Sequence, residues 1–200
     1  MSKSFKITTV GDAGVGKTSL SLRYVHSYYK QINDSTIGAA FLVKKIKLND
    51  EDATVHIWDT AGQERFHAIV PMYLRDADAV LYMFDLNNLN TLENIFKTWI
   101  PIVEKTYNIK NCVYYLVGNK NDIFQKDVDV EKETQKYIKK YYVDIPNFKF
   151  YTTSAITGDN VDKLFESLIK DIDGLRNGID EKNIEHLNLS KQESSYFCCT

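Results

Sequence analysis

Residues 11–18 read Gly-Asp-Ala-Gly-Val-Gly-Lys-Thr, which is the phosphate-binding pattern G-x-x-x-x-G-K-[ST]. The run 5–10 before it has the composition of a strand, and residues 17–28 read as a helix. In this context the loop amides would wrap a chain of phosphates and Thr18 would ligate Mg²⁺. A glycine-rich turn is the alternative. The predicted phosphate-binding residues are Asp12, Ala13, Gly14, Val15, Gly16, Lys17, Thr18 and Ser19.

The bulk composition is that of one ordinary globular domain. The chain has 200 residues, of which 26% are charged and 44% hydrophobic, with a formal net charge of −2. Without a basic surplus we expect no nucleic-acid partner, and no run is long and apolar enough to suggest a membrane span. Three cysteines do not make a disulfide framework, and Cys112 is expected to be a small core residue. We expect a monomer.

Strand-like and helix-like segments alternate along the chain. The predicted strands are 5–10, 41–48, 53–59, 80–84, 112–117 and 148–152, and the predicted helices are 17–28, 91–107, 129–142 and 161–172. This order predicts an α/β fold of the P-loop NTPase kind: a six-stranded, mostly parallel sheet with one antiparallel edge strand and helices on both faces. Pro101 should kink or split its helix.

Two further motifs should lie near the phosphates, because ligands of such sheets bind at the carboxyl ends of strands. After the strand ending at Trp58, Asp59 could hold Mg²⁺ directly or through water, Gly62 could present its N–H to a γ-phosphate, and Gln63 could orient an attacking water. Thr36 could offer its hydroxyl to Mg²⁺ and its N–H to the γ-phosphate, so that loss of this phosphate would release the segment. Alone, each could be a surface loop or a strand entry.

A third group of residues suits a guanine base. The carboxylate of Asp122, in Asn119-Lys120-Asn121-Asp122, could accept hydrogen bonds from the N1–H and exocyclic amino group of guanine, a donor pair that adenine lacks. In Thr153-Ser154-Ala155, the N–H of Ala155 could donate to the guanine carbonyl oxygen. In isolation Asn119–Asp122 would be read as a solvated turn, and the triplet 153–155 has almost no specificity by itself.

Taken together, residues 11–18, Thr36, 58–64, 119–122 and 154–155 resemble the Ras superfamily of small GTPases. Within it, Thr36-Ile37-Gly38-Ala39-Ala40-Phe41, residues 58–66 and the double-cysteine terminus resemble the Rab family. Residues 36–41, with His67 and Pro71-Met72-Tyr73, are most similar to its early-endosomal subclass.

The resemblance implies roles for individual residues. Lys17, Thr36 and Gln63 would be catalytic. Thr18 and Thr36 would ligate Mg²⁺, with Asp59 one shell further out. The resemblance also implies a base site and an aromatic surface triad for effectors, although from the residues alone the triad would more often be core. The base site would comprise Tyr29, Asn119, Lys120, Asp122, Ser154, Ala155 and Ile156, and the triad Phe41, Trp58 and Tyr73.

Three positions depart from the family pattern. Ile156 stands where a lysine is usual, so a polar contact to the base is lost while Asp122 should keep guanine selectivity. Residues 73–76 replace a Tyr-Tyr-Arg-Gly pattern, which puts the packing of the second switch in doubt. Ala13 lies where Ras proteins have glycine, but Rab proteins vary there.

The chain ends Phe197-Cys198-Cys199-Thr200, which does not fit the C-a-a-X rule. The tandem Cys198 and Cys199 resemble the Rab signal for two geranylgeranyl groups, and two lipids anchor stably. A pair of exposed thiols is the alternative. We expect a domain over residues 1–174 and a flexible tail over 175–200.

These features predict a GTP-hydrolysing switch, with Mg²⁺ and GTP or GDP bound, that regulates endocytic or early-endosomal vesicle traffic. Hydrolysis should be slow without an activating protein, because the first switch offers no arginine finger. The implied partners are an exchange factor, a GTPase-activating protein, a GDP dissociation inhibitor, a Rab escort protein and effectors of the GTP state. The expected location is the cytoplasmic face of endosomal membranes, in exchange with the cytosol. A P-loop kinase or ATPase, or a module that binds nucleotide without hydrolysing it, are the alternatives.

Overall fold

The computed structural model describes residues 3–29, 36–106, 112–125, 129–141 and 149–193. Within them, six strands form one sheet in the order β2-β3-β1-β4-β5-β6. The strands are β1 (Lys3–Val10), β2 (Ala39–Leu48), β3 (Glu51–Thr60), β4 (Ala79–Asp85), β5 (Val113–Asn119) and β6 (Lys149–Thr152). The helical elements are α1 (Lys17–His26), η1 (Glu64–Ile69), α2 (Val70–Leu74), α3 (Leu89–Asn94), η2 (Ile95–Trp99), α4 (Ile100–Thr106), η4 (Asn121–Ile123), α5 (Val130–Tyr141) and α6 (Val161–Glu193).

The predicted sheet is confirmed. Among the described strands, only β2 and β3 pair antiparallel, and the other neighbours pair in parallel. Asn49 and Asp50 join β2 to β3 with φ angles of 52° and 65°. Two consecutive left-handed residues make the tight turn that matches the twist of a hairpin, and Asn and Asp tolerate this conformation better than most side chains.

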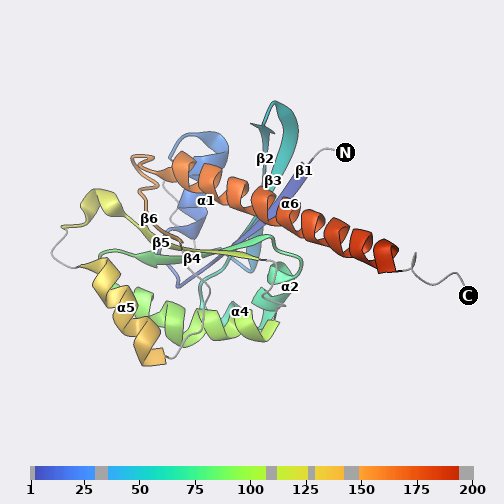
Figure 1. The fold of residues 1–200 in the computed structure, drawn as a ribbon. Helices are drawn as coiled ribbons and strands as arrows, with labels where there is room; N and C mark the ends of the chain where they lie inside the picture. Colours follow the sequence, from blue (N-terminus) through green and yellow to red (C-terminus); the bar gives the residue numbers. More distant parts are fainter. Residues whose placement is uncertain (1–2, 30–35, 107–111, 126–128, 142–148, 194–200) are drawn as a thin grey trace, which may run out of the picture.

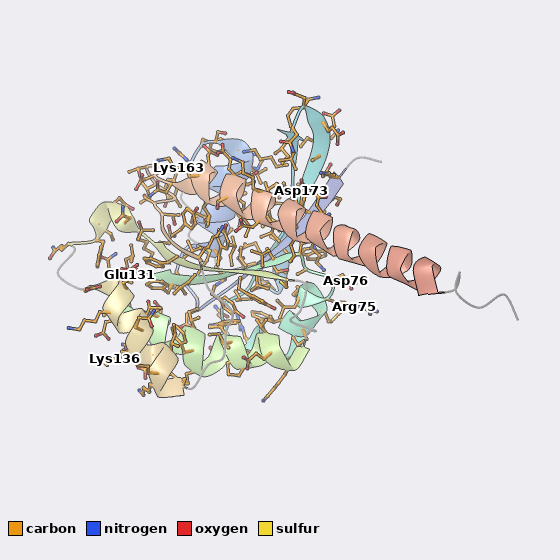
Figure 2. All side chains as sticks on the ribbon, in the orientation of Figure 1. Arg75, Asp76, Glu131, Lys136, Lys163 and Asp173 are labelled. Carbon is orange, nitrogen blue, oxygen red and sulfur yellow. The ribbon has the colours of Figure 1, made fainter. Side chains whose placement is uncertain are left out.

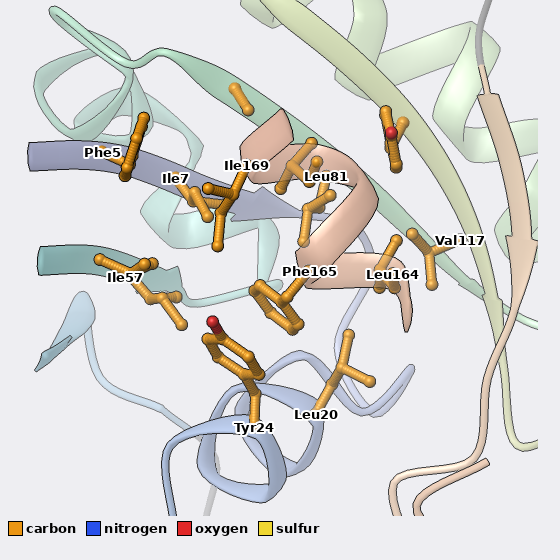
Figure 3. Close-up of a cluster of buried hydrophobic side chains, with 14 of the residues drawn as sticks. Phe5, Ile7, Leu20, Tyr24, Ile57, Leu81, Val117, Leu164, Phe165 and Ile169 are labelled. Atoms are coloured by element: carbon orange, nitrogen blue, oxygen red, sulfur yellow. The ribbon is translucent and has the colours of Figure 1, made fainter. Parts of the chain in front are cut away.

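Helices cover both faces of the sheet, each over its own hydrophobic core (Figure 1). On one face α1 and α6 meet, and the rings of Tyr24 and Phe165 stack with centroids 3.8 Å apart (Figure 3). On the other face α2–α5 enclose a second core around Trp99 and Phe84. Burying one large apolar side chain contributes about 1.5–3 kcal/mol, so both layers stabilise the sheet substantially.

The helix predicted over 91–107 is split, as Pro101 predicts. A π-helical turn, η2, separates α3 from α4 and ends two residues before the proline. Because proline has no N–H, the regular i→i−4 ladder cannot continue through it. The turn closes instead with a bond from the N–H of Ile100 to the carbonyl of Ile95, five residues back.

The last helix is longer than the sequence suggests. The apolar stripe ends near Gly174, yet α6 continues to Glu193. Residues 175–193 contain no proline and many good helix formers, so the helix can continue without an apolar stripe. Arg176 lies beyond the expected domain end, but its guanidinium donates to the carbonyl of Ser4 at 2.9 Å and to Asp78 at 2.5 Å.

Charged side chains gather at the periphery of the molecule, as Figure 2 shows for Arg75 and Asp76 beside α2 and for Lys163 on α6, whereas Asp173 on the same helix is buried. In the described part of the chain no helix is both long and apolar enough to cross a lipid bilayer.

Candidate nucleotide-binding site

The predicted motifs meet at one edge of the sheet. Gly11 follows β1, Asp59 lies at the end of β3, Asn119 ends β5, and Thr153 follows β6. Since these four strands are parallel, their carboxyl ends share one edge, where ligands of such sheets bind. The topology therefore assembles the site that the separate motifs predict.

The phosphate loop is a tight turn that leads into α1. Gly16 has a φ of 96°, and a Cβ atom there would lie 2.2 Å from Nδ2 of Asn119, so only glycine fits. The Nζ of Lys17 donates to the carbonyls of Gly11 at 2.7 Å and Asp12 at 2.8 Å. Burial lowers the pKa of Lys17 to about 8, against the charges of Asp59 and Asp12, which raise it. The loop thus holds a desolvated ammonium group at the base of α1.

Three oxygen-bearing side chains converge beside this lysine. The hydroxyl of Thr18 lies 2.8 Å from that of Thr36 and donates to Oδ2 of Asp59 at 2.5 Å. Burial raises the pKa of the Asp59 carboxyl, while the bond from Thr18 and the charge of Lys17 lower it. The hydroxyl of Thr9 donates to the other carboxylate oxygen of Asp59, Oδ1, at 3.3 Å. The segment containing Thr36 therefore reaches the phosphate loop, although it is 18 residues away in sequence.

The chemistry of this cluster fits Mg²⁺. Magnesium prefers oxygen ligands and is usually held by one or two protein groups plus substrate phosphates. Thr18, Thr36 and Asp59 offer hydroxyl and carboxylate oxygens, and no group of three His, Cys, Asp or Glu side chains suited to a metal occurs among the described residues. A magnesium ion here would thus depend on the phosphates to complete its coordination.

Gly62 lies against the phosphate loop. A Cβ atom at this position would come within 2.4 Å of the backbone N of Ala13 and the backbone carbon of Asp12. The N–H of Ala61 donates to the carbonyl of Gly38 at 2.8 Å, which connects this segment to the one that carries Thr36. Gln63 follows directly, at the entry to η1.

A pocket of about 110 Å³ lies on the other side of the phosphate loop. The hydroxyl of Ser154 donates to Oδ1 of Asp122 at 2.6 Å, which orients the carboxylate. Ala155 is buried, whereas Ile156 and Ile123 are more than half exposed at the rim. The pocket is lined by Gly16, Ser19, Tyr29, Asn119, Lys120, Asp122, Ile123, Ala155 and Ile156.

The side chain of Asn119 connects its own loop to two others by hydrogen bonds. Its Nδ2 donates to the carbonyl of Val15 at 2.9 Å, and its Oδ1 accepts from the hydroxyl of Thr153 at 3.2 Å. Lys120, in a left-handed conformation with φ 67°, forms an ion pair with Asp85 at 2.7 Å. The structure thus gives Asn119 a bridging position, while Asp122 offers its carboxylate to the pocket.

Comparison with known proteins agrees with this geometry. The sequence model described as "Ras family" matches residues 6–174. The chain belongs to the Ras family. It is 39% identical over 166 residues to Ras-related protein Rab-5A of Dictyostelium discoideum, covering 83% of this chain and 79% of the relative. It is 36% identical over 168 residues to putative Ras-related protein Rab-5B of the same organism, covering 84% and 75%.

This similarity confirms the predicted resemblance to Rab proteins of the early-endosomal subclass. Ras-family proteins are GTPases that bind GTP or GDP with Mg²⁺, and this protein is a Rab GTPase of membrane traffic. The predicted P-loop NTPase fold is confirmed as well.

The three aromatic residues predicted to form an effector surface are not core residues of this Ras-family domain. The ring of Trp58 lies 4.9 Å from Phe41 and 5.5 Å from Tyr73, measured between centroids. Phe41 is 51% exposed, and the other two are partly exposed. The three rings therefore form a contiguous surface patch over β2, β3 and α2, next to Lys6, whose Nζ lies 5.4 Å from the Trp58 ring.

Sequence reasoning missed two residues that contact the phosphate loop of this Ras-family site. Asn94 and Trp99 both donate to the side chain of Asp12. Five positions apart, they fall on different faces of an α-helix, so helical periodicity separates them. Pro101 was the one available signal, because it marks the irregular turn that brings them together. The predicted lipidation sites Cys198 and Cys199 lie outside the described residues.

Proposed function

We propose that this Rab GTPase is a switch that recruits effectors to endosomal membranes while GTP is bound. The contact between the hydroxyls of Thr18 and Thr36, 2.8 Å apart, carries this proposal. It connects the helix after the phosphate loop to the segment that enters β2, next to Phe41 of the aromatic patch. A ligand that engages both threonines would therefore fix the position of the entry to β2.

The residues of the phosphate site divide the work of hydrolysis. Lys17 and the loop amides would bind the β- and γ-phosphates, and Thr18 and Thr36 would hold Mg²⁺, with Asp59 behind Thr18, to which the Thr18 hydroxyl donates. When bound, Mg²⁺ neutralises charge that develops on the phosphate oxygens. Gly62 lets its segment approach the phosphate loop, and Gln63 orients the attacking water. Catalysis then depends mainly on positioning and electrostatic stabilisation.

The base pocket accounts for selectivity toward guanine. The hydroxyl of Ser154 orients the Asp122 carboxylate, which can accept from the base while the N–H of Ala155 meets the base's carbonyl oxygen. A base without the paired donors of guanine would leave this carboxylate unsatisfied, which costs about 1–3 kcal/mol or more. Tyr29 and Ile156 would cover the two faces of the base from the rim of the pocket.

A cycle between GTP-bound and GDP-bound forms follows from slow intrinsic GTP hydrolysis and a lipid anchor. An activating protein would supply the missing cation for hydrolysis, and an exchange factor would release GDP. Geranylgeranyl groups on Cys198 and Cys199 would hold the GTP form on the cytoplasmic face of endosomal membranes. An escort protein would present the chain for lipidation, and a dissociation inhibitor would return its GDP form to the cytosol.

Two measurements test the proposal. Competition of ATP against fluorescent GDP should show at least a hundredfold preference for guanine nucleotide, since each lost hydrogen bond to a charged group costs about 1.5–3 kcal/mol. In cells, the tagged full chain should colocalise with endosomes, and the Cys198→Ser/Cys199→Ser variant should remain diffuse. Equal affinity for ATP would refute the guanine assignment, and membrane binding by the serine variant would refute the lipid anchor.

A further inference from the structure

Both carboxylate oxygens of Asp12 accept hydrogen bonds from other side chains, although the residue lies within the proposed phosphate-binding loop. Its Oδ2 accepts from Nδ2 of Asn94 at 2.7 Å, and its Oδ1 accepts from Nε1 of Trp99 at 2.8 Å. A free carboxylate at this place would repel an anionic ligand. The two donors hold it against α3 and η2, while the backbone carbonyl of the same residue receives Lys17 at 2.8 Å.

Trp99 requires a hydrogen-bond acceptor for its buried indole N–H, and this carboxylate provides one. Its side chain is completely buried, and the indole nitrogen can only donate. A buried indole N–H needs an acceptor, and a bond to an ionised acceptor is about twice as strong as one between neutral groups. The position of Asp12 is thus coupled to the position of a rigid, fully packed ring.

The π-helical turn is what allows both donors to reach one carboxylate. In an α-helix, residues five apart point about 140° away from each other. In η2 the i→i+5 bond between Ile95 and Ile100 widens the turn, so residues five apart share a face. Asn94 directly precedes the widened turn and Trp99 ends it. The irregular turn before Pro101 therefore has a specific geometric result at the phosphate loop.

The same indole contacts the segment that follows Gln63. The ring of His67, in η1, meets Trp99 edge-on, with centroids 4.6 Å apart and planes inclined by 70°. One side chain therefore contacts the phosphate loop through its N–H and η1 through its ring. These two segments flank the place where the γ-phosphate of GTP would lie.

We propose that Trp99 is a positioning residue that sets the phosphate loop and the segment after Gln63 relative to each other. The inference rests on the proposed nucleotide site. Trp99 acts on nucleotide retention through Asp12 and on the alignment of Gln63 through His67. Asn94 completes the pair of donors that orients Asp12.

Trp99→Phe separates the two actions, because phenylalanine keeps a ring beside His67 but has no donor. We expect GDP to dissociate about tenfold faster, which corresponds to about 1.4 kcal/mol, with single-turnover hydrolysis changed less than about threefold. Phe96→Leu, at a buried position of the same π turn, should lower the melting temperature without changing GDP release. This control separates loss of packing from loss of the indole donor.

A double-mutant cycle with Asp12→Ala tests whether Trp99 affects GDP release through the Asp12 carboxylate. If Trp99 acts through the carboxylate, Trp99→Phe should have no further effect on GDP release once Asp12 is alanine. Asn94→Ala, at a partly exposed position, provides the same cycle if Trp99→Phe does not fold. Additive effects in a parent that binds GDP would overturn this inference alone. A parent that fails to bind GDP would overturn the proposed nucleotide site together with it.

Discussion

The guanidinium of Arg176 lies 2.5 Å from Oδ1 of Asp78, and this contact joins the middle of α6 to the residue that precedes β4. The Oδ2 of Asp78 accepts from the backbone N–H of Lys6 at 2.7 Å, and the guanidinium also lies over the ring of Phe5, 5.3 Å from its centroid. Arg176 therefore belongs structurally to the domain, two residues beyond its predicted end.

We expect Arg176→Ala to lower the free energy of unfolding by about 1–2 kcal/mol, because it removes charge-assisted hydrogen bonds that are only partly exposed. For a domain of this size that corresponds to a decrease in melting temperature of about 2–8 °C. Thermal unfolding of the GDP-bound protein measures it. Lys163→Ala, on an exposed face of the same helix (Figure 2), is the matched control. Equal effects of the two variants would show that the contact to Asp78 contributes nothing.

Ser154→Ala should weaken GDP binding about tenfold, because it removes the donor that orients Asp122. Asp122→Ala should weaken it at least a hundredfold, since the guanine donors then lose their acceptor. Titration calorimetry of both variants measures these effects. Asp129→Ala, which removes a carboxylate outside the pocket, should bind GDP like the parent. A Ser154→Ala variant with unchanged affinity would contradict the proposed orientation of the carboxylate.

Gln63→Leu should slow single-turnover GTP hydrolysis at least tenfold while nucleotide affinity stays the same, because the change removes a group that orients water without removing a phosphate contact. Rapid-quench measurement of phosphate release follows the rate. Glu64→Gln, at the neighbouring exposed position, is the control and should hydrolyse GTP at the parent rate. Equal rates for Gln63→Leu and the parent would mean that Gln63 is not catalytic.

Cys112 should be protected from thiol reagents in the folded protein. Burial raises the pKa of its thiol to about 12, so the folded state disfavours the reactive thiolate. Above the unfolded pKa of about 8.5 the unfolded chain releases this proton first, and stability should therefore fall as the pH rises from about 8.5 to 12. Labelling of the Cys198→Ser/Cys199→Ser variant at pH 8, folded and in denaturant, measures the protection. Rapid labelling of the folded form would contradict the buried position.

The sequence predicts the site well wherever chemistry and topology coincide. Asp59 and Asn119 each follow a recognisable strand, and parallel strands bring their ends together whatever lies between them. Contacts that depend on an irregular backbone were missed. The pairing of Asn94 with Trp99 requires a π turn, and η1 with α2 is too short to show a helical period.

The end of α6 shows a different limit of sequence reading. Beyond Gly174 the sequence has no apolar stripe, and periodicity detects only helices that bury one face. Arg176 holds its part of the helix through polar contacts instead. The aromatic patch was ambiguous for a related reason, because Phe41, Trp58 and Tyr73 are as apolar as core residues and only the fold shows that they remain accessible.

The two hydrophobic cores lie on opposite faces of the sheet, and they serve different parts of the site. The core shared by α1 and α6 supports the helix that follows the phosphate loop, whereas α2 and the π turn belong to the other. Substitutions around the π turn should therefore reach the nucleotide through Trp99 and Asp12, and substitutions in the first core should reach it through α1. The sheet therefore separates two groups of buried residues, and a sequence change on either face can alter the same nucleotide site by a different route.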